Sequence, residues 1–390
     1  MMESDITYPC LQMMKNTSDG FKNLTCLQND DGGRPLVVNP ALFDSHFNLA
    51  MIYISVIAVA LFIGTFGNLM ILLVAFWSRG LNKVGKEFMV NLALADLCVA
   101  AIADPMCIVG VIKGEHFFSD KPWLCNLIAS MCLTACFCAF ASLTMLSLNR
   151  YVYLCHNEIY DKMYGRITCI VICVMCWITA FLCEFPNFVG WGGHYFDQQA
   201  NQCIWDRTSS LSYTLFVAIG LIGFPLLTMT ICFILIFRRI WNTKKALYDI
   251  DKGKDGRMGK VMVESFRAAK TIFVIFVVFV ICWTPYAVVI AIDVENTLPM
   301  PVHLFLTLLA HLHSSCNFII YFVGNKRFRV VLGRILGCHD KTAILSETKS
   351  SSVPDSPDTT RYNNFSGIKP QLKITKKQTS TGSDSYDGHM

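Results

Sequence analysis

Residues 124–148 read LCNLIASMCLTACFCAFASLTMLSL and are followed at once by Asn149, Arg150 and Tyr151. The stretch contains no charged residue. As a helix it can cross roughly 30 Å of hydrocarbon, which takes about 20 residues. Similar apolar runs occur approximately at Ile52–Trp77, Phe88–Val111, Ile167–Phe185, Leu211–Phe237, Ala268–Ile292 and Val302–Val323. The sequence therefore predicts an all-α protein, a seven-transmembrane helix bundle over residues 48–325.

The composition agrees with this interpretation. Of 390 residues, 54% are hydrophobic and only 16% are charged, whereas a soluble domain carries about a quarter charged residues. One globular domain with buried helices would need shorter, amphipathic runs. The net charge of +5 is mild, and the sequence has no basic stripe interleaved with aromatic residues. A nucleic-acid partner is therefore not expected. No nucleophile–base set, metal-ligand spacing or cofactor motif predicts an enzyme. A transporter or channel is a remote alternative, because no inverted repeat or selectivity motif is visible.

The Lys and Arg residues predict the orientation in the membrane. They gather in the connections after the first, third and fifth runs, whereas the opposite loops hold only Lys113, Lys121 and Arg207. Basic loops stay in the cytoplasm. We therefore expect a multi-pass plasma-membrane protein whose N-terminus is extracellular and whose C-terminus is cytoplasmic.

The segments before and after the bundle are expected to differ from it. Residues 1–47 are predicted to form an extracellular tail glycosylated at Asn16 and Asn23, each of which begins an Asn-x-Ser/Thr sequon. There is no apolar run near residue 1, so a cleaved signal peptide is not expected. Residues 326–338 are predicted to form a short cytoplasmic amphipathic helix, with Cys338 as a candidate for palmitoylation against membrane lipid.

Residues 339–390 are rich in Ser, Thr, Lys, Asp and Pro, and this composition predicts a disordered cytoplasmic tail. The Ser and Thr clusters favour a phosphorylation platform over a passive tail, because each phosphate adds about −1.5 to −2 charges.

Two of the eighteen cysteines are predicted to form a disulfide. Most cysteines lie inside the apolar runs, where a thiol acts as a small apolar group. Cys125 begins the third run on its outer side and Cys203 lies in the long outer loop, in an oxidising compartment. A bridge between them would fold the loop over the bundle as a lid. Cys10 and Cys26 are also outside, and could pair with each other or with a loop.

Polar residues inside the apolar runs are costly, on the order of 2.5–3.5 kcal/mol by insertion scales, and therefore mark function. Asp96 is the clearest, with Asn68 and Asn317 as expected partners in a polar core. That core is either a switchable network or a satisfied structural one. Pro285 follows Trp283 closely, so a large aromatic residue lies at a predicted helix kink.

Eight motifs occur in order along the runs: Gly67-Asn68, Leu94-Ala95-Asp96, Trp123-x-Cys125, Asn149-Arg150-Tyr151, Trp177, Pro225, Cys282-Trp283-x-Pro285 and Asn317-x-x-x-Tyr321. With these motifs the sequence resembles the rhodopsin-like (class A) G-protein-coupled receptors over roughly residues 48–338.

Within that class the chain looks most like the melatonin receptors and their relatives. The third-run motif begins with Asn149, where most of the class has Asp, and continues into a similar second inner loop. The seventh-run motif has Phe318 where most of the class has Pro and the melatonin receptors have Ala. Pro186-Asn187 ends the fourth run in both.

The resemblance implies a cell-surface receptor for an extracellular small ligand. Its implied intracellular partners are a heterotrimeric G protein, of the inhibitory Gi/o class, and arrestin and receptor kinases at the C-terminal tail. The implied G-protein switch consists of Asn149, Arg150, Tyr151 and Tyr321.

The ligand is the least determined part of the prediction. The resemblance implies contacts from Asn187, Trp205, Arg207 and Trp283. However, Trp205 and Arg207 replace the family's Phe and Gln, and Leu221 replaces its fifth-run His. The hypothesis is a flat aromatic ligand of the indole type, held by Asn187 and by stacking on Trp205. Arg207 would suit an acidic or carbonyl-bearing ligand better than melatonin.

Other receptors of the same fold are alternatives. A receptor for an unrelated small molecule or peptide stays open. A visual pigment is excluded because Val302–Val323 contains no Lys, and an amine receptor because Cys132 stands where that class has Asp.

Overall fold

The computed structural model describes residues 11–15, 23–29, 35–38, 40–77, 85–250 and 256–337. Cys10, Asn16, Cys338 and residues 339–390 lie outside these described residues, so the expectations for them stay predictions.

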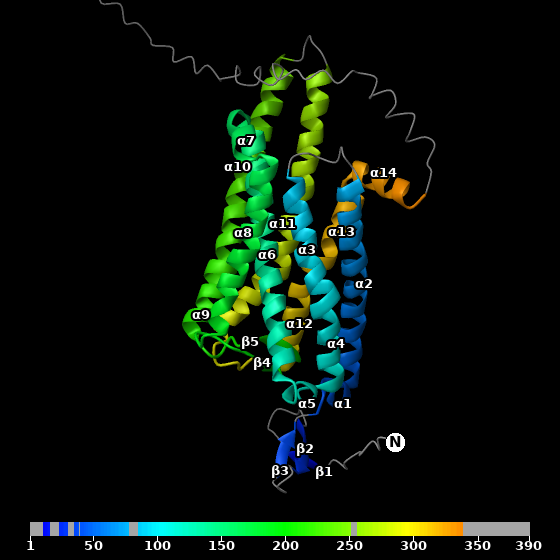
Figure 1. Cartoon of the computed structure of the whole chain (residues 1–390), viewed down its shortest axis with the longest axis vertical. Helices are drawn as coiled ribbons and strands as arrows, with labels where there is room; N and C mark the ends of the chain where they lie inside the picture. The colour runs from blue at the N-terminus through cyan, green and yellow to red at the C-terminus, as the bar shows by residue number, and fades with distance from the viewer. Residues whose placement is uncertain are drawn as a thin grey trace, which may run out of the picture. The chain divides into compact units, whose positions relative to one another are not determined.

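Seven membrane-spanning segments form the bundle (Figure 1). Six are single long apolar helices, and the seventh is a pair of helices bent by 40°. In chain order the segments are built from α2 (Phe47–Trp77); α3 (Lys86–Cys98), η1 (Val99–Ala103), α4 (Asp104–Lys113) and α5 (His116–Ser119); α6 (Pro122–Cys155); α8 (Arg166–Glu184) and η2 (Phe185–Asn187); α9 (Leu211–Leu215), η3 (Phe216–Gly223) and α10 (Phe224–Ile250); α11 (Gly256–Ile292); and α12 (Met300–His311) with α13 (His313–Gly324).

Short helices accompany the bundle. They are α1 (Leu42–Ser45), α7 (Asn157–Met163) and α14 (Lys326–Ile335). The last is the amphipathic helix expected after the seventh span, and the Asn325 side chain caps it by accepting a hydrogen bond from the backbone amide of Phe328 (3.2 Å).

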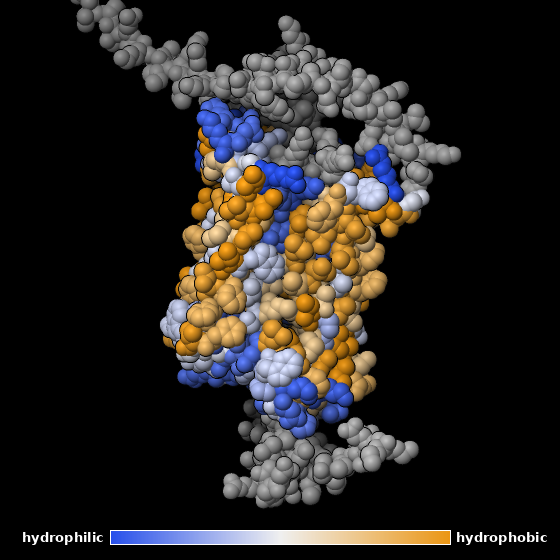
Figure 2. Space-filling model, in the orientation of Figure 1, coloured by the Kyte–Doolittle hydropathy of each residue, from blue (hydrophilic) through white to orange (hydrophobic). Residues whose placement is uncertain are grey.

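Large apolar side chains cover the outer surface of the helices in a broad band, with hydrophilic residues at both ends (Figure 2). Phe62, Phe76 and Ile167 are each about 70% exposed or more. A soluble protein would hide such side chains. In a bilayer they face lipid, so this band is the surface that the membrane covers.

Two spans contain a π-helical stretch directly before a proline. η1 precedes Pro105, and η3 precedes Pro225. The proline ring clashes with the carbonyl four residues earlier, and that carbonyl lies within the π-helical stretch in both cases. Widening the turn relieves the clash while keeping most backbone hydrogen bonds.

The bend in the seventh span needs no proline. Side chains of three consecutive residues bond to carbonyls of the preceding turn: His313 Nδ1 to Ala310 (2.5 Å), Ser314 Oγ to His311 (2.9 Å) and Ser315 Oγ to Leu312 (2.9 Å). These bonds compete with the helical backbone pattern. The bend between α12 and α13 therefore has a local cause in the sequence.

α6 is the central helix of the bundle. It packs against α3, α8 and α10, and against strand β5 of the outer loop. Its inner faces are rich in small buried residues such as Ala129, Ala135, Cys138, Ala139 and Ser142. Small side chains allow helices in a membrane to approach closely.

The outer loop forms a two-stranded antiparallel lid, β4 (His194–Asp197) and β5 (Gln202–Trp205). A disulfide joins Cys203 in β5 to Cys125 in α6, with their Cα atoms 5.2 Å apart, so the predicted bridge is confirmed. At the hairpin turn Asn201 has a φ of 52°, and a Cβ on Gly110 of α4 would lie only 2.3 Å from its carbonyl oxygen. Gly110 therefore permits the turn to rest on α4.

The expectation of an all-helical chain needs one addition. Besides the β4–β5 lid, residues before the bundle form an antiparallel sheet in the order β1 (Leu11–Lys15), β2 (Asn23–Asn29) and β3 (Pro35–Val38). Asn23, one of the predicted glycosylation sites, is the first residue of β2.

A close helix contact gives the first prediction. A Cβ added to Gly67 in α2 would lie 2.4 Å from the Cβ of Phe318 in α13. Because the Cβ of Phe318 is fixed by its backbone, the two helices would have to separate. We expect Gly67→Ala to lower the stability of the detergent-purified protein by about 1–3 kcal/mol, measured by thermal unfolding.

Gly220→Ala is the matched control, because its Cβ would meet only the Phe216 ring at 3.4 Å. Equal thermal stability of the two variants would contradict this account of the α2–α13 contact.

Candidate ligand cavity and signalling switch

A cavity lies beneath the lid. It is bounded by residues of α4, α6, η3, α11 and α12, with β5 above it. Concave, mostly apolar sites of this kind suit a small organic ligand. The lining is mostly apolar and contains no Lys, Arg, Asp or Glu; its polar members are Gln202, Thr307, Tyr286, His311, Cys107, Cys132 and Cys136.

Trp205 forms part of the roof of this cavity. The disulfide at Cys203 anchors its strand, and its indole Nε1 donates a hydrogen bond to the hydroxyl of Tyr286 in α11 (3.1 Å). Its ring also meets Tyr213 of α9 edge-on at 5.7 Å between centroids. The indole nitrogen is thus occupied within the protein, and only the ring surface is left for a ligand.

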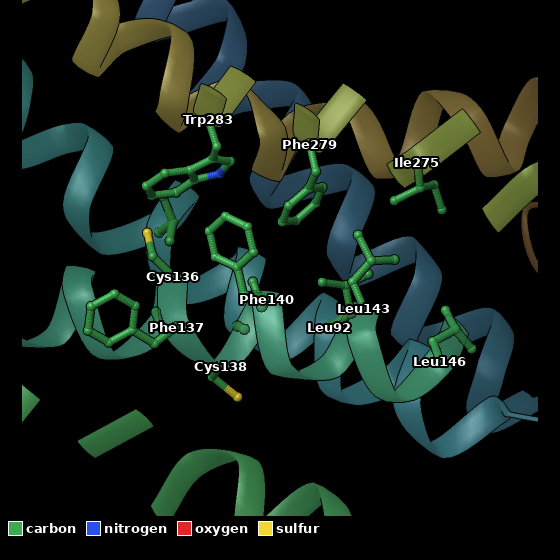
Figure 3. Packing of buried hydrophobic residues seen from close by; sticks show 14 of the residues in the cluster. Leu92, Cys136, Phe137, Cys138, Phe140, Leu143, Leu146, Ile275, Phe279 and Trp283 are labelled. Carbon is green, nitrogen blue, oxygen red and sulfur yellow. The ribbon is translucent and has the colours of Figure 1, made fainter. Parts of the chain in front are cut away.

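Trp283 forms the floor. Figure 3 shows Trp283 and Phe279 pointing from α11 toward Phe140 on α6. The Phe140 ring centroid is 5.0 Å from that of Trp283 and 5.5 Å from that of Phe279. His313 of α13 lies 5.4 Å from Trp283 and 4.9 Å from Phe279. A ligand that moves Trp283 would therefore disturb the packing of α6, α11 and α13 together.

Asn187 is not among the residues that line this cavity, so its predicted contact with a ligand stays a prediction. Its amide nitrogen donates to Glu184 Oε2 and to the hydroxyl of Tyr213, each at 2.8 Å. Glu184 also pairs with His194 of the lid (2.5 Å). A buried carboxylate needs such partners, so Asn187 serves a structural network at the outer end of α8.

Arg207 is also not among the lining residues, and its predicted contact with a ligand likewise stays a prediction. Its guanidinium donates to the carbonyl of Asp293 (3.2 Å) and to Asn296 Oδ1, and lies 4.0 Å from the Asp293 carboxylate. His303 of α12 contacts both Arg207 (3.4 Å) and Asp293 (2.8 Å). The charge of Arg207 is therefore compensated within the protein, by residues at the outer ends of α11 and α12.

Asp293 is the centre of this outer cluster. Burial acts to raise the pKa of its carboxyl group, but hydrogen bonds from Thr297, Leu298 and His303 outweigh burial and bring that pKa below its ordinary value. A lowered pKa means that the stabilising contribution is present at neutral pH and is lost as the pH falls through the lowered value. The sequence analysis did not identify Asp293 as a site residue. The feature that could have identified it is its position just after an apolar run, on the same side of the bundle as the loop that carries Arg207.

A second missed arrangement borders the cavity itself. His311 Nδ1 lies 2.7 Å from Asp104 Oδ1, and His311 Nε2 lies 3.8 Å from the sulfur of Cys132. Asp104 and His311 lie in the second and seventh apolar runs, and the sequence alone does not show that these two runs bring them together.

The predicted polar core is assembled in part. The amide of Asn317 donates to Asp96 Oδ2. The other carboxylate oxygen of Asp96 faces His313 Nε2 at 3.5 Å, and both side chains are fully buried. Asn68 instead donates to the backbone carbonyls of Gly64 (2.9 Å) and Ser314 (2.8 Å). His313 is thus a member of the core that sequence reasoning missed.

The predicted switch residues gather at the C-terminal end of α6, which the sequence predicts to be cytoplasmic. Arg150 is 7% exposed, and it lines a second cavity, of about 410 Å³, together with Tyr321 of α13. The amide of Asn149 donates to the hydroxyl of Tyr160 in α7 (3.2 Å), and burial raises the pKa of Tyr160 to about 12. Tyr151 lies apart, with its hydroxyl 2.9 Å from His156 Nε2. Arg150 and Tyr321 are therefore neighbours, whereas Asn149 and Tyr151 hold the adjoining loop.

Comparison with known proteins agrees with this geometry. Residues 67–321 match the family model described as 7 transmembrane receptor (rhodopsin family). The structure is similar to the crystal structure of squid rhodopsin, with a TM-score of 0.65 and 19% identity, covering 78% of this chain and 93% of that chain.

Similar sequences include melatonin receptor type 1B-B of Danio rerio, 28% identical over 288 residues (72% of this chain and 80% of the relative). Melatonin receptor type 1B of Homo sapiens is 29% identical over 289 residues (72% and 77%). Melatonin receptor type 1A of Mus musculus is 27% identical over 312 residues (78% and 83%). With seven spans, a lidded cavity and a buried arginine at the C-terminal end of α6, the chain belongs to the rhodopsin family of seven-transmembrane receptors and is a multi-pass G-protein-coupled receptor of the plasma membrane related to the melatonin receptors.

Proposed function

We propose that this receptor binds a small, uncharged, flat aromatic ligand in the cavity under the lid and activates a heterotrimeric G protein of the Gi/o class. The observation that carries the proposal is the position of two tryptophans, Trp205 in the roof and Trp283 in the floor of one cavity. The similar receptors are melatonin receptors, and this supports an indole as the first ligand class to test.

The uncharged character of the ligand follows from the lining. A charged ligand loses its hydration when it enters such a cavity and must find a protein partner of opposite charge. No Lys, Arg, Asp or Glu lines this cavity, and Arg207 is compensated by Asp293. The cluster around Arg207 therefore removes the reason to expect an acidic ligand.

The ligand signal would pass through the aromatic contacts below the cavity. Trp283, Phe140, Phe279 and His313 form an unbroken chain of ring contacts that ends beside Asp96. Pro285 lies within α11 two residues beyond Trp283, so α11 has a hinge next to the first member of this chain. Repacking of these rings would bias one of two positions of the cytoplasmic half of α11.

At the cytoplasmic end, Arg150 would be released from its buried position to contact the G protein. The residue that directly precedes Arg150 is the neutral Asn149, where most of the class has Asp. The proposed orientation places this end in the cytoplasm and the N-terminus, with Asn16 and Asn23, outside. It is supported by the basic residues near this end, such as Arg238 and Arg239.

The first functional prediction concerns Trp205. Loss of ring contact is worth on the order of 0.5–1.5 kcal/mol, so Trp205→Ala should weaken binding of melatonin roughly 2- to 10-fold in a radioligand assay on purified receptor. Indole-3-acetate should compete much more weakly, because among the described residues no Lys or Arg lines the cavity to pair with its carboxylate, and the His311 imidazole already faces Asp104.

The matched control is Trp191→Ala. Trp191 is another tryptophan of the outer loop, but it is 43% exposed and does not line the cavity. This variant should bind as the wild type does. Wild-type receptor that binds no neutral indole, or unchanged affinity in Trp205→Ala, would show that this ligand assignment is wrong.

The second functional prediction concerns Arg150. Arg150→Ala should abolish agonist-stimulated guanine-nucleotide exchange on purified Gi or Go, while ligand binding is kept, because the ligand cavity is formed at the other end of α6. Arg238→Ala removes an equal charge from an exposed cytoplasmic position on α10 and should keep most of the exchange. Normal exchange by a folded Arg150→Ala receptor would refute the assignment.

A further inference from the structure

Three side chains from three helices form a connected row at the wall of the outer cavity. Cys132 of α6 and His311 of α12 line the cavity, and Asp104 of α4 lies behind His311 with no exposed surface. The distances are 3.8 Å from the Cys132 sulfur to His311 Nε2 and 2.7 Å from His311 Nδ1 to Asp104 Oδ1.

We propose that Cys132 is a covalent modification site that captures small, uncharged α,β-unsaturated carbonyl compounds entering the ligand cavity. The row has the order thiol, imidazole, carboxylate, in which a base activates the nucleophile and a third group orients the base. This inference deepens the proposed function, because it concerns the same cavity and requires that small molecules reach it.

The carboxylate determines which imidazole nitrogen can act. Asp104 accepts the Nδ1 proton of His311, and this leaves the lone pair of Nε2 facing the sulfur of Cys132. Within the described part of the chain, the second carboxylate oxygen of Asp104 has no hydrogen-bond partner although it is buried. A carboxylate that is only half satisfied favours a positive charge on the adjacent imidazole, and so favours transfer of the thiol proton to His311.

The proposed step balances without an oxidant or a leaving group. The Cys132 thiol gives its proton to His311 Nε2, and the sulfur attacks the β-carbon to form a carbon–sulfur bond. The electron pair of the carbon–carbon double bond moves onto the carbonyl oxygen as an enolate. His311 then returns the proton to the α-carbon, and a thioether remains.

The surroundings select the chemical class of the electrophile. The other lining residues include Met106, Leu133 and Trp283, and among the described residues no Lys, Arg, Asp or Glu side chain lines the cavity. A charged reagent would therefore be excluded. A metal ion is not the favoured occupant, because the described residues contain no group of three or more His, Cys, Asp or Glu side chains placed to hold one.

The cavity contains its own controls. Cys107 and Cys136 line the same space, but the contact with the His311 ring belongs to Cys132. An ordinary thiol, with a pKa near 8.5, is only about 3% ionised at pH 7. Ionisation of Cys132 raises its reactivity, although the lower basicity of a stabilised thiolate reduces part of this gain. We therefore expect Cys132 to react about tenfold faster than the other two.

The experiment treats purified full-length receptor with N-ethylmaleimide at pH 7 and follows each cysteine-containing peptide by mass spectrometry over time. Cys132 should be alkylated about tenfold faster than Cys107 and Cys136, and a sulfonated maleimide should react with it much more slowly. Equal rates for the three thiols in the wild-type receptor would overturn the proposal without any variant.

His311→Asn separates activation from simple access. It keeps a polar side chain of smaller size, so access to Cys132 is not reduced, while the base is lost. The Cys132 rate should fall to that of Cys107. An unchanged rate in a variant with wild-type thermal stability would show that exposure alone explains the reactivity.

The two proposals fail in different ways. Failure of Cys132 alkylation in a receptor that still drives nucleotide exchange with a neutral indole would refute covalent capture alone. Rapid Cys132 alkylation in a receptor that binds no indole would support capture and refute the proposed ligand.

Discussion

Lipid gives the peptide backbone no hydrogen-bond partners, so every amide and carbonyl in the membrane must be satisfied inside the protein. Long helices meet this requirement, and the seven spans follow from it. Where the helical pattern is interrupted, the freed groups find local substitutes. The side chains of His313, Ser314 and Ser315 bind carbonyls at the bend of the seventh span. Proline distortions at Pro105 and Pro225 are spread over π-helical turns. The bend of the seventh span and the π-helical turns are thus the places where backbone groups are satisfied by something other than regular α-helical hydrogen bonds.

The same constraint governs the ionisable side chains. Four of the buried carboxylates each meet a histidine from another part of the chain. These pairs are His194–Glu184, His303–Asp293, His311–Asp104 and His313–Asp96. Such buried pairs need not add net stability, because desolvation offsets their attraction. They do restrict how the helices can be arranged, since a shift of one helix would leave a charge without its partner. Two of the pairs lie directly above and below the aromatic contacts of Trp283 and Phe279.

Charge compensation inside the protein also shapes the ligand site. Arg207 and Asn187, the polar residues that resemblance to the melatonin receptors would aim at a ligand, are held by Asp293 and Glu184 instead. The cavity that is left is apolar, with Trp205 and Trp283 as its largest aromatic surfaces. The polar side chains that could react with a ligand are concentrated at one point on the cavity wall, around His311. In the proposed function, recognition therefore depends on shape and aromatic contact more than on ion pairing.

The sequence by itself determined the seven spans and the fold class, because a hydrophobic run of about 20 residues has one stable form in lipid. It also determined the Cys125–Cys203 bridge, since few cysteines lie outside the spans, and the pairing of Asp96 with Asn317. Only the tertiary structure decided which polar residues share a site. His311 and Asp104 are 207 positions apart, and no periodicity within either span indicates the rotation of one helix against another. The directions of Asn187 and Arg207 were undetermined for the same reason: a side chain takes the partner that three-dimensional packing brings within hydrogen-bond distance, and the linear order of residues does not contain that distance.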